Sequence, residues 1–173
     1  SFICPMVKAN AYGVGDTLVV GTLLEAGVNH FGVARTFEGE KLRRFFPNQK
    51  FDILVFNALT KESVRECIFS SLTPVVGSFS DLEVLKRFGL EVLPFKKVHL
   101  KVDLGMTRFG VSLADAKKVK VSLKQLGLEV EGLCGHFPNS EDLGAKADQT
   151  SKLLEKLIEC AKELGITEEK VHA

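Results

Sequence analysis

A lysine beside a short glycine loop is the first residue in this chain that could do covalent chemistry. Lys8 lies in the stretch VKANAYGVG, residues 7–15, directly after an apolar run. Partial burial lowers the pKa of a lysine, and a neutral amine can attack a carbonyl carbon to form a Schiff base. Gly13 and Gly15 let the backbone approach a ligand closely, and Tyr12 can hydrogen-bond a polar group there. The alternative is a solvated lysine at a strand end.

A second group of polar residues lies in HLKVDLGMTRFG, residues 99–110. In a strand, His99, Lys101 and Asp103 share one face, so three polar side chains would point together into the interior. Such burial is costly unless the groups pair with one another. A paired network could orient Arg108, whose planar guanidinium suits a carboxylate, a phosphate or a phenolate. The alternative is an edge strand with this face open to water.

Three more histidines differ in whether their positions favour a structural or a catalytic role. His136 follows a predicted strand and precedes a loop that contains Pro138, and both a structural and a catalytic role fit it. His172 follows the start of the last predicted strand. His30 lies at a strand start, which favours a structural role.

Two alternating patterns predict the elements that must position these residues. Apolar, β-branched runs predict seven strands, at residues 2–8, 30–34, 52–56, 73–76, 98–103, 128–136 and from about Lys170. Amphipathic segments predict helices between them. These are a helix capped by Asp16 that ends at Gly27, one that ends at Pro47, one at 60–69, one opened by a Ser80–Glu83 capping box and ended by Gly89, one between Ser112 and Gly127, and one at 145–164.

Repeated βα units of roughly 20 to 30 residues fit either a doubly wound sheet or a (β/α)8 barrel, and the even spacing favours the barrel. Seven strands leave the barrel incomplete, and natural proteins avoid the open strand edges that result. We therefore expect an α/β fold, an incomplete (β/α)8 TIM-type barrel, in which residues 1–173 form one truncated domain. Reactive side chains of such barrels lie at the carboxyl ends of strands, where Lys8, Asp103, His136 and His172 fall.

The amino-acid composition and charge limit the kinds of partner that the protein can bind. The formal net charge is +1 with both signs mixed along the chain, so nothing favours a nucleic acid or an anionic membrane, and a small molecule fits better. The apolar runs are strand-sized, far short of a membrane span. The chain opens with neither a basic segment nor a small-residue cleavage site, and its four cysteines are widely spaced. These features predict reduced core thiols in the cytoplasm, without disulfides or a metal site.

Together these motifs resemble the alanine racemase family of fold-type III enzymes, which use pyridoxal phosphate (PLP). Family members carry VKANAYGxG around the cofactor lysine, which residues 7–15 match with Val14 at the variable position. They also carry HLKxDxGMxRxG, matched at residues 99–110, and a THFxxADE-like loop to which residues 135–142 correspond more loosely. Residues 171–173 are similar to the start of the family's VHxANS segment.

The resemblance implies a role for each matched residue. Lys8 would hold PLP as a Schiff base and, once released, act as the base for the α-proton of D-alanine. Tyr12 would bind the phosphate, and Arg108 would contact the PLP phenolate side and the substrate carboxylate. His136 would line the cofactor site. Supporting roles would fall to Lys101, carbamylated and paired with the arginine in several family members, to Asp103, and to His172, which would orient a later arginine.

The reaction that the resemblance implies is interconversion of L-alanine and D-alanine, which supplies D-alanine for bacterial peptidoglycan. PLP acts as the electron sink, and racemisation needs a proton donor or acceptor on each face of the planar intermediate. In the family the second base is a tyrosine from the C-terminal β-domain of the partner subunit. We therefore expect a homodimer for the complete enzyme and no activity for residues 1–173 alone.

Three other functions stay open. A broader amino-acid racemase uses a similar lysine motif. A non-catalytic PLP-binding barrel protein would lack an equivalent of the KxDxGMxR stretch, matched here at residues 101–108, whose presence argues for a racemase. The third is a barrel domain without a cofactor.

Overall fold

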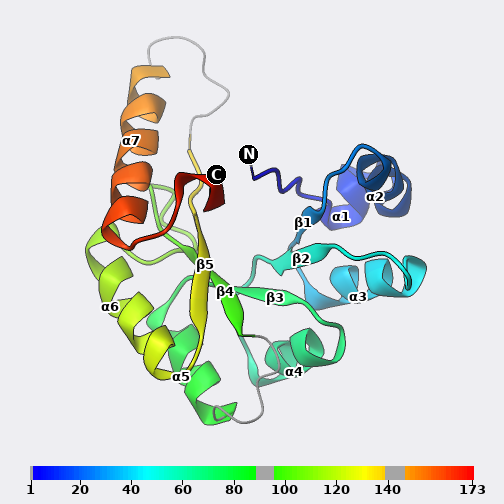
Figure 1. Ribbon diagram of the computed structural model, residues 1–173, viewed down its shortest axis with the longest axis horizontal. Coiled ribbons are helices and arrows are strands. Elements are labelled where there is room, and N and C mark those ends of the chain that lie inside the picture. The colour runs from blue at the N-terminus through cyan, green and yellow to red at the C-terminus, as the bar shows by residue number, and fades with distance from the viewer. Residues whose placement is uncertain (1, 89–95, 139–146) are drawn as a thin grey trace.

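The computed structural model describes residues 2–88, 96–138 and 147–173. Within these ranges six parallel strands form one sheet in the order β1-β2-β3-β4-β5-β6. The strands are β1 (His30–Val33), β2 (Asp52–Val55), β3 (Thr73–Val76), β4 (Lys97–Lys101), β5 (Glu129–Cys134) and β6 (Val171–His172). In a doubly wound sheet the strand order would reverse, whereas in a barrel it follows the chain. The sheet is curled with helices along its outer side, and the barrel prediction is confirmed (Figure 1).

The helices follow the predicted pattern with different boundaries. They are α1 (Lys8–Tyr12), α2 (Asp16–Glu25), α3 (Thr36–Phe45), α4 (Lys61–Phe69), α5 (Phe79–Phe88), α6 (Leu113–Gln125), α7 (Ala147–Glu163) and a 3-10 helix at Glu168–Lys170. Thr60 and Ser112 cap α4 and α6 through their side chains, as helix-start residues do.

Two predicted helix starts are wrong. Asp16 is the first residue of α2, at whose cap position Gly15 lies. Ser80 lies inside α5, and the hydroxyl of Ser78 accepts the N–H of Asp81 at 3.1 Å instead. Gly89 and residues 145–146 lie outside the described residues.

The first predicted strand, residues 2–8, is reduced to a short contact with β1. Met6 forms an isolated parallel bridge with Gly32, whose N–H donates to the carbonyl of Pro5 at 2.9 Å. Pro5 has no N–H to continue the ladder on one side, and Lys8 begins a helical turn on the other. Lys8 is therefore the first residue of a turn and not the last residue of a strand.

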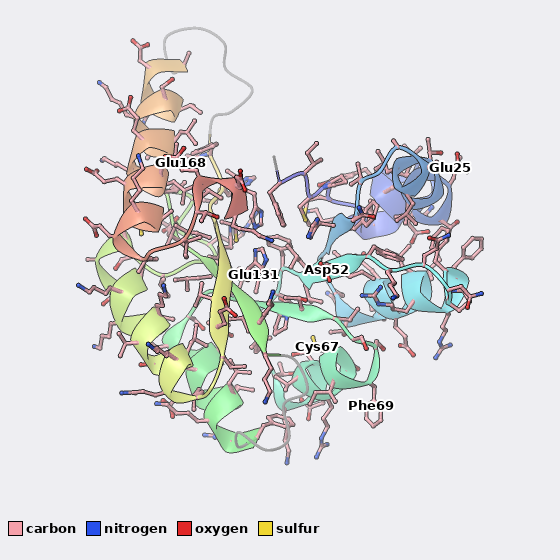
Figure 2. The ribbon with its side chains drawn as sticks, in the orientation of Figure 1. Glu25, Asp52, Cys67, Phe69, Glu131 and Glu168 are labelled. Carbon is pink, nitrogen blue, oxygen red and sulfur yellow. The ribbon has the colours of Figure 1, made fainter. Side chains whose placement is uncertain are left out.

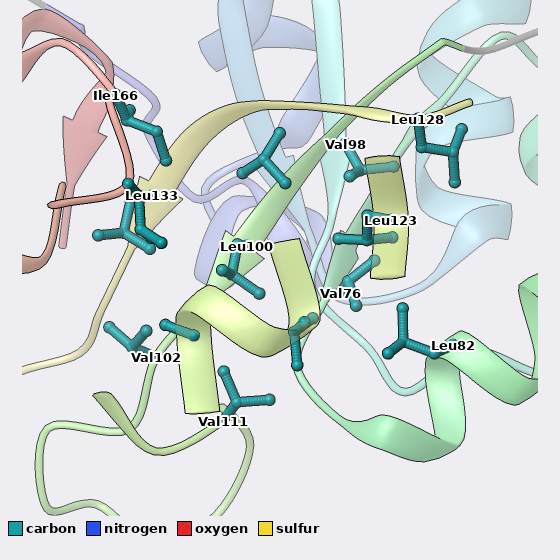
Figure 3. Close-up of a cluster of buried hydrophobic side chains, with 14 of the residues drawn as sticks. Val76, Leu82, Val98, Leu100, Val102, Val111, Leu123, Leu128, Leu133 and Ile166 are labelled. Carbon is teal, nitrogen blue, oxygen red and sulfur yellow. The ribbon is translucent and has the colours of Figure 1, made fainter. Parts of the chain in front are cut away.

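Alternate residues of β4 face the helices and the barrel interior, because side chains alternate across a strand. Val98 and Leu100 are fully buried in the core that covers the outer face of the sheet (Figure 3). Leu82 from α5 and Leu123 from α6 pack into the same core. His99, between the two outward residues, lies on the interior face, where it contacts β6. The hydrophobic contacts thus fix which polar residues of β4 face inward.

A β-bulge sets the partner of His99. The register between β4 and β5 shifts after Val98, so that Val98 pairs with Val130 and His99 pairs with Gly132. A Cβ on Gly132 would lie 2.4 Å from Cε1 of His99, so the ring occupies the space that the glycine leaves. Glu131, at the bulge, pairs instead with Lys97 at 2.8 Å (Figure 2). The bulge thus places the buried ring of His99 opposite a glycine, where there is room for it.

The cysteines agree with the predicted core thiols. All four are free, and Cys67, Cys134 and Cys160 are buried. Burial raises the pKa of Cys67 and Cys134 to about 12, which keeps both thiols protonated and unreactive. Across the described ranges, no helix has the length and apolarity that a membrane crossing requires.

Candidate functional site

A pocket of about 420 Å³ lies at the carboxyl ends of the strands, a volume typical of small-molecule sites. The pocket is lined by residues from the segment before α1, from α1, and from the ends of β1, β2, β4, β5 and β6. Six of the residues singled out in the sequence line it: Lys8, Tyr12, Lys101, Arg108, His136 and His172. Residues from opposite ends of the chain, such as Lys8 and His172, therefore meet, as a barrel with its site on this face requires.

The lysine is presented by an unusual left-handed turn. Four consecutive residues after Lys8, from Ala9 to Tyr12, have φ between 50° and 57°. Left-handed helical conformation costs non-glycine residues roughly 1–2 kcal/mol each, so the surrounding structure must hold this turn. Gly13 follows at φ 92° and closes it by donating its N–H to the carbonyl of Ala9 at 3.1 Å. The turn folds the chain back so that Nζ of Lys8 lies 5.7 Å from the Tyr12 ring centroid.

Lys101 and Arg108 lie close together at the pocket wall. Lys101, at the end of β4, is half-buried and donates from Nζ to the carbonyl of Gly135 at 3.2 Å. Burial lowers the pKa of Lys101, and the positive charge of Arg108 lowers it further. Arg108 is exposed and lines the same pocket.

The predicted placement of Asp103 in the strand is wrong. β4 ends at Lys101, so Asp103 belongs to the following loop and does not share a strand face with His99. Its carboxylate accepts the N–H groups of Gly105 and Thr107, both at 3.0 Å. It therefore holds the backbone of the loop that precedes Arg108.

His99, which is buried, and His172, which is partly buried, form a direct pair. Nδ1 of His99 lies 2.9 Å from Nε2 of His172, and His99 is only 1% exposed. Burial lowers the pKa of His99 to about 4 and that of His172 to about 3. Both rings are therefore neutral at neutral pH, and one donates an N–H to the other. His172 also lines the pocket, so this pair fixes one of its walls.

Positive charge dominates the mouth of the pocket. His136 is exposed, and partial burial lowers its pKa together with the charges of Lys101, Arg108 and Lys8. Three cations thus act on one imidazole from three different elements. Such a cluster favours an anionic ligand.

Sequence reasoning missed two residues that hold the site. Glu38, in α3, accepts the N–H of Ala9 at 2.7 Å, directly after the lysine. The Phe2 ring lies 4.7 Å from the ring of His172 and 4.4 Å from that of His30. The cap position of α3 is Arg35, which gives no capping signature in the sequence. Nothing in the sequence distinguished Phe2 from the other phenylalanines.

Comparisons with known proteins agree with this geometry. Residues 1–173 match the family described as alanine racemase, N-terminal domain. The alanine racemase of Helicobacter pylori strain P12 is 37% identical over 144 residues, which cover 80% of this chain and 37% of that protein. The alanine racemase of Borreliella burgdorferi strain ZS7 is 29% identical over 171 residues, which cover 98% of this chain and 45% of that protein.

Solved structures give the same result. The alanine racemase of Clostridium difficile 630 superposes with a TM-score of 0.78 at 27% identity, over 94% of this chain and 43% of the other. Its complex with cycloserine gives a TM-score of 0.80 at 26% identity, over 98% and 46%. The chain thus spans less than half the length of the relatives it matches. With the fold, the motifs and these matches in agreement, the chain belongs to the alanine racemase family and corresponds to its N-terminal domain.

Proposed function

We propose that the protein containing this chain interconverts L-alanine and D-alanine with PLP bound at Lys8. The observation that carries the proposal is the convergence of Lys8, Lys101, Arg108 and His136 on one pocket at the carboxyl ends of the strands. The family to which the chain belongs supports the same activity. The alanine racemase of Clostridium difficile has been solved with cycloserine, and that of Bacillus anthracis with bound L-Ala-P, both at 25% identity or more.

The residues of the pocket fit this cofactor. PLP carries an aldehyde for an amine, and an anionic phosphate and phenolate for cations. The pocket offers the Lys8 amine, and its three cations lower the pKa of His136. When bound, PLP supplies an electron sink that makes the α-proton of an amino acid removable.

The first group of proposed roles concerns binding and proton transfer. Lys8 holds the cofactor through Nζ and accepts the α-proton of D-alanine once that amine is free. Tyr12 binds the phosphate through its hydroxyl. Arg108 binds the substrate carboxylate, which matches a guanidinium in charge and in planar geometry.

The remaining residues support this group. The like charges of Lys101 and Arg108 repel each other, and a carbamate on Nζ of Lys101 would turn that repulsion into a salt bridge. The lowered pKa of Lys101 increases the neutral amine that such a modification needs. Asp103 shapes the loop before Arg108. His136 lines the cofactor site. His172 orients a later arginine of the complete protein, and His99 holds the His172 ring in place through their direct contact.

The proposal also covers the oligomeric state, the cellular compartment and the substrate. We propose residues 1–173 as the N-terminal barrel domain of a homodimer whose second base, a tyrosine, comes from the C-terminal domain of the partner subunit. The free thiols support a reducing compartment, the cytoplasm, where the product D-alanine would serve peptidoglycan synthesis. The substrate is a small amino acid, with alanine favoured over broader specificity by the family match.

A trapping experiment tests the cofactor assignment. The protein is incubated with PLP and reduced with borohydride, and the phosphopyridoxyl group is located by peptide mass spectrometry. We expect one label, on Lys8, which Lys8→Ala removes and Lys61→Ala, at an exposed lysine of α4, leaves in place. Labels scattered over many lysines would contradict the assignment. In the complete protein that contains residues 1–173, a label on Lys8 without conversion of L-alanine to D-alanine would favour the non-catalytic PLP-binding protein.

A further inference from the structure

The carboxylate of Glu38 joins two walls of the pocket. Oε1 accepts the N–H of Ala9 at 2.7 Å, and Oε2 accepts the N–H groups of Ala34 and Arg35, both at 2.9 Å. Ala34 and Arg35 precede α3, and Ala34 itself lines the pocket. A glutamate near a helix start ordinarily accepts N–H groups of its own helix start. The bond to Ala9 crosses 29 residues of sequence and needs a separate explanation.

The position of Ala9 supplies that explanation. Its N–H belongs to the peptide that joins Lys8 to Ala9, so fixing this N–H fixes the plane from which the lysine side chain departs. Ala9 is also the first of the four residues with positive φ, a conformation that alanine does not favour. A hydrogen bond to a carboxylate is roughly twice as strong as one between neutral groups. Glu38 thus acts on the strained turn at the residue where the strain begins.

We propose that Glu38 is a positioning residue for Lys8. By holding the Lys8–Ala9 peptide and the β1–α3 loop with one carboxylate, it sets the direction in which Nζ of Lys8 enters the pocket. This inference rests on the proposed function, because it concerns the amine that is proposed to hold PLP.

Glu38→Gln tests the inference with the smallest change in shape. Glutamine has one side-chain oxygen, and at Glu38 one oxygen serves two N–H groups while the other serves Ala9. We expect the amide oxygen to stay with Ala34 and Arg35, so that its NH2 faces the Ala9 N–H, donor against donor. The variant should therefore lose the Ala9 bond and keep the helix start. Glu40→Gln is the matched control, since it removes the same charge from an α3 residue that pairs only with Arg44 in the described contacts.

Two readouts separate positioning from general stability. We expect the Ala9 amide of Glu38→Gln to exchange its hydrogen about tenfold faster in NMR, with the amides of Ala34 and Arg35 unchanged. We also expect about tenfold weaker PLP binding, measured by fluorescence titration, with Glu40→Gln equal to the wild type in both.

The opposite results are equally clear. Unchanged exchange at Ala9, equal loss of protection along α3, or a variant that fails to fold would each overturn the inference, because a capping role alone explains them. Unchanged PLP affinity with faster Ala9 exchange would overturn the link to Lys8. If the wild type takes no label on Lys8, the proposed function fails, while the exchange measurement still reports whether Glu38 holds the turn.

Discussion

At the scale of single residues, the pair formed by His99 and His172 gives the clearest pH dependence. Burial is the largest cause that lowers the pKa of His99. The charge of Glu131 raises this pKa, and the charges of Lys170 and His30 lower it. The pKa of His172 is lowered by burial and, after that, by His99, Lys101 and His30. Both shifts have the same sign, so protonation of either ring works against the folded state.

The first prediction follows from these shifts. The folded pKa of His99 lies below its unfolded value of 6.5, so the unfolded state binds more protons and stability falls as the pH drops below 6.5. Above pH 6.5 the stability should not change through this group. Between pH 7 and pH 5 we expect His99 to lower the free energy of unfolding by about 2 kcal/mol. Urea unfolding at the two pH values measures it.

His99→Gln isolates this contribution. The variant should be less stable than the wild type at pH 7, because it loses the contact with His172, but its stability should change less between pH 7 and pH 5. His30→Gln is the control, since that ring is partly exposed beside Asp52. An equal pH dependence in wild type and His99→Gln would rule out His99 as its source.

At the scale of elements, the loop after β4 carries Arg108, for which we propose substrate binding, and one carboxylate holds the loop. Asp103 holds the loop through the N–H groups of Gly105 and Thr107, and Thr107 has a positive φ of 51° directly before Arg108. The loop returns to β4 at Val111, whose N–H donates to the carbonyl of Lys101 at 3.0 Å. These backbone bonds therefore set the path of the loop that carries Arg108.

The second prediction concerns Asp103→Ala. Loss of the two backbone hydrogen bonds at a partly exposed site should cost about 1 kcal/mol of stability, and the less ordered Arg108 should raise the KM for alanine about tenfold with a smaller change in kcat. Asp103→Asn keeps one acceptor and should recover part of the KM. Steady-state kinetics of the wild type and the two variants, each made in the complete protein that contains residues 1–173, test this. A fall in kcat with an unchanged KM would place Asp103 in the chemical step instead.

Elements also show how far the sequence could be interpreted. The alternation of strands and helices and the caps at Thr60 and Ser112 follow from local propensity, so they were predictable. The end of β4 at Lys101 was not, because a period of two continues through Asp103 and only the loop hydrogen bonds end it. The left-handed turn at Lys8 was also hidden, since Ala9 and Ala11 favour right-handed helix by propensity. The sequence thus pointed to six residues that line the pocket, and it did not reveal the contacts that position them.

At the scale of the whole molecule, one aromatic ring connects the first and last segments of the sheet. Phe2 precedes the Met6 bridge to β1, and its ring contacts the rings of His30 on β1, His99 on β4 and His172 on β6. The N-terminal segment and β6 face each other across the open side of the curled sheet (Figure 1). This ring therefore brings the segment that leads to Lys8 against the strand that supplies His172.

The last prediction tests that connection. Phe2→Ala should lower the free energy of unfolding by about 2 kcal/mol, since the ring is partly buried against the histidines. It should also speed hydrogen exchange together at Val7, whose N–H donates to the carbonyl of Gly32, and at Gly135, whose N–H donates to the carbonyl of His172. Phe69→Ala is the matched control: the ring of Phe69 is 87% exposed on the outer side of α4 (Figure 2), and its loss should change stability by less than about 0.5 kcal/mol. Denaturant unfolding gives the energies. Faster exchange at only one of the two sites would mean that the N-terminal segment and β6 are held independently, and that Phe2 packs against the histidines without joining them.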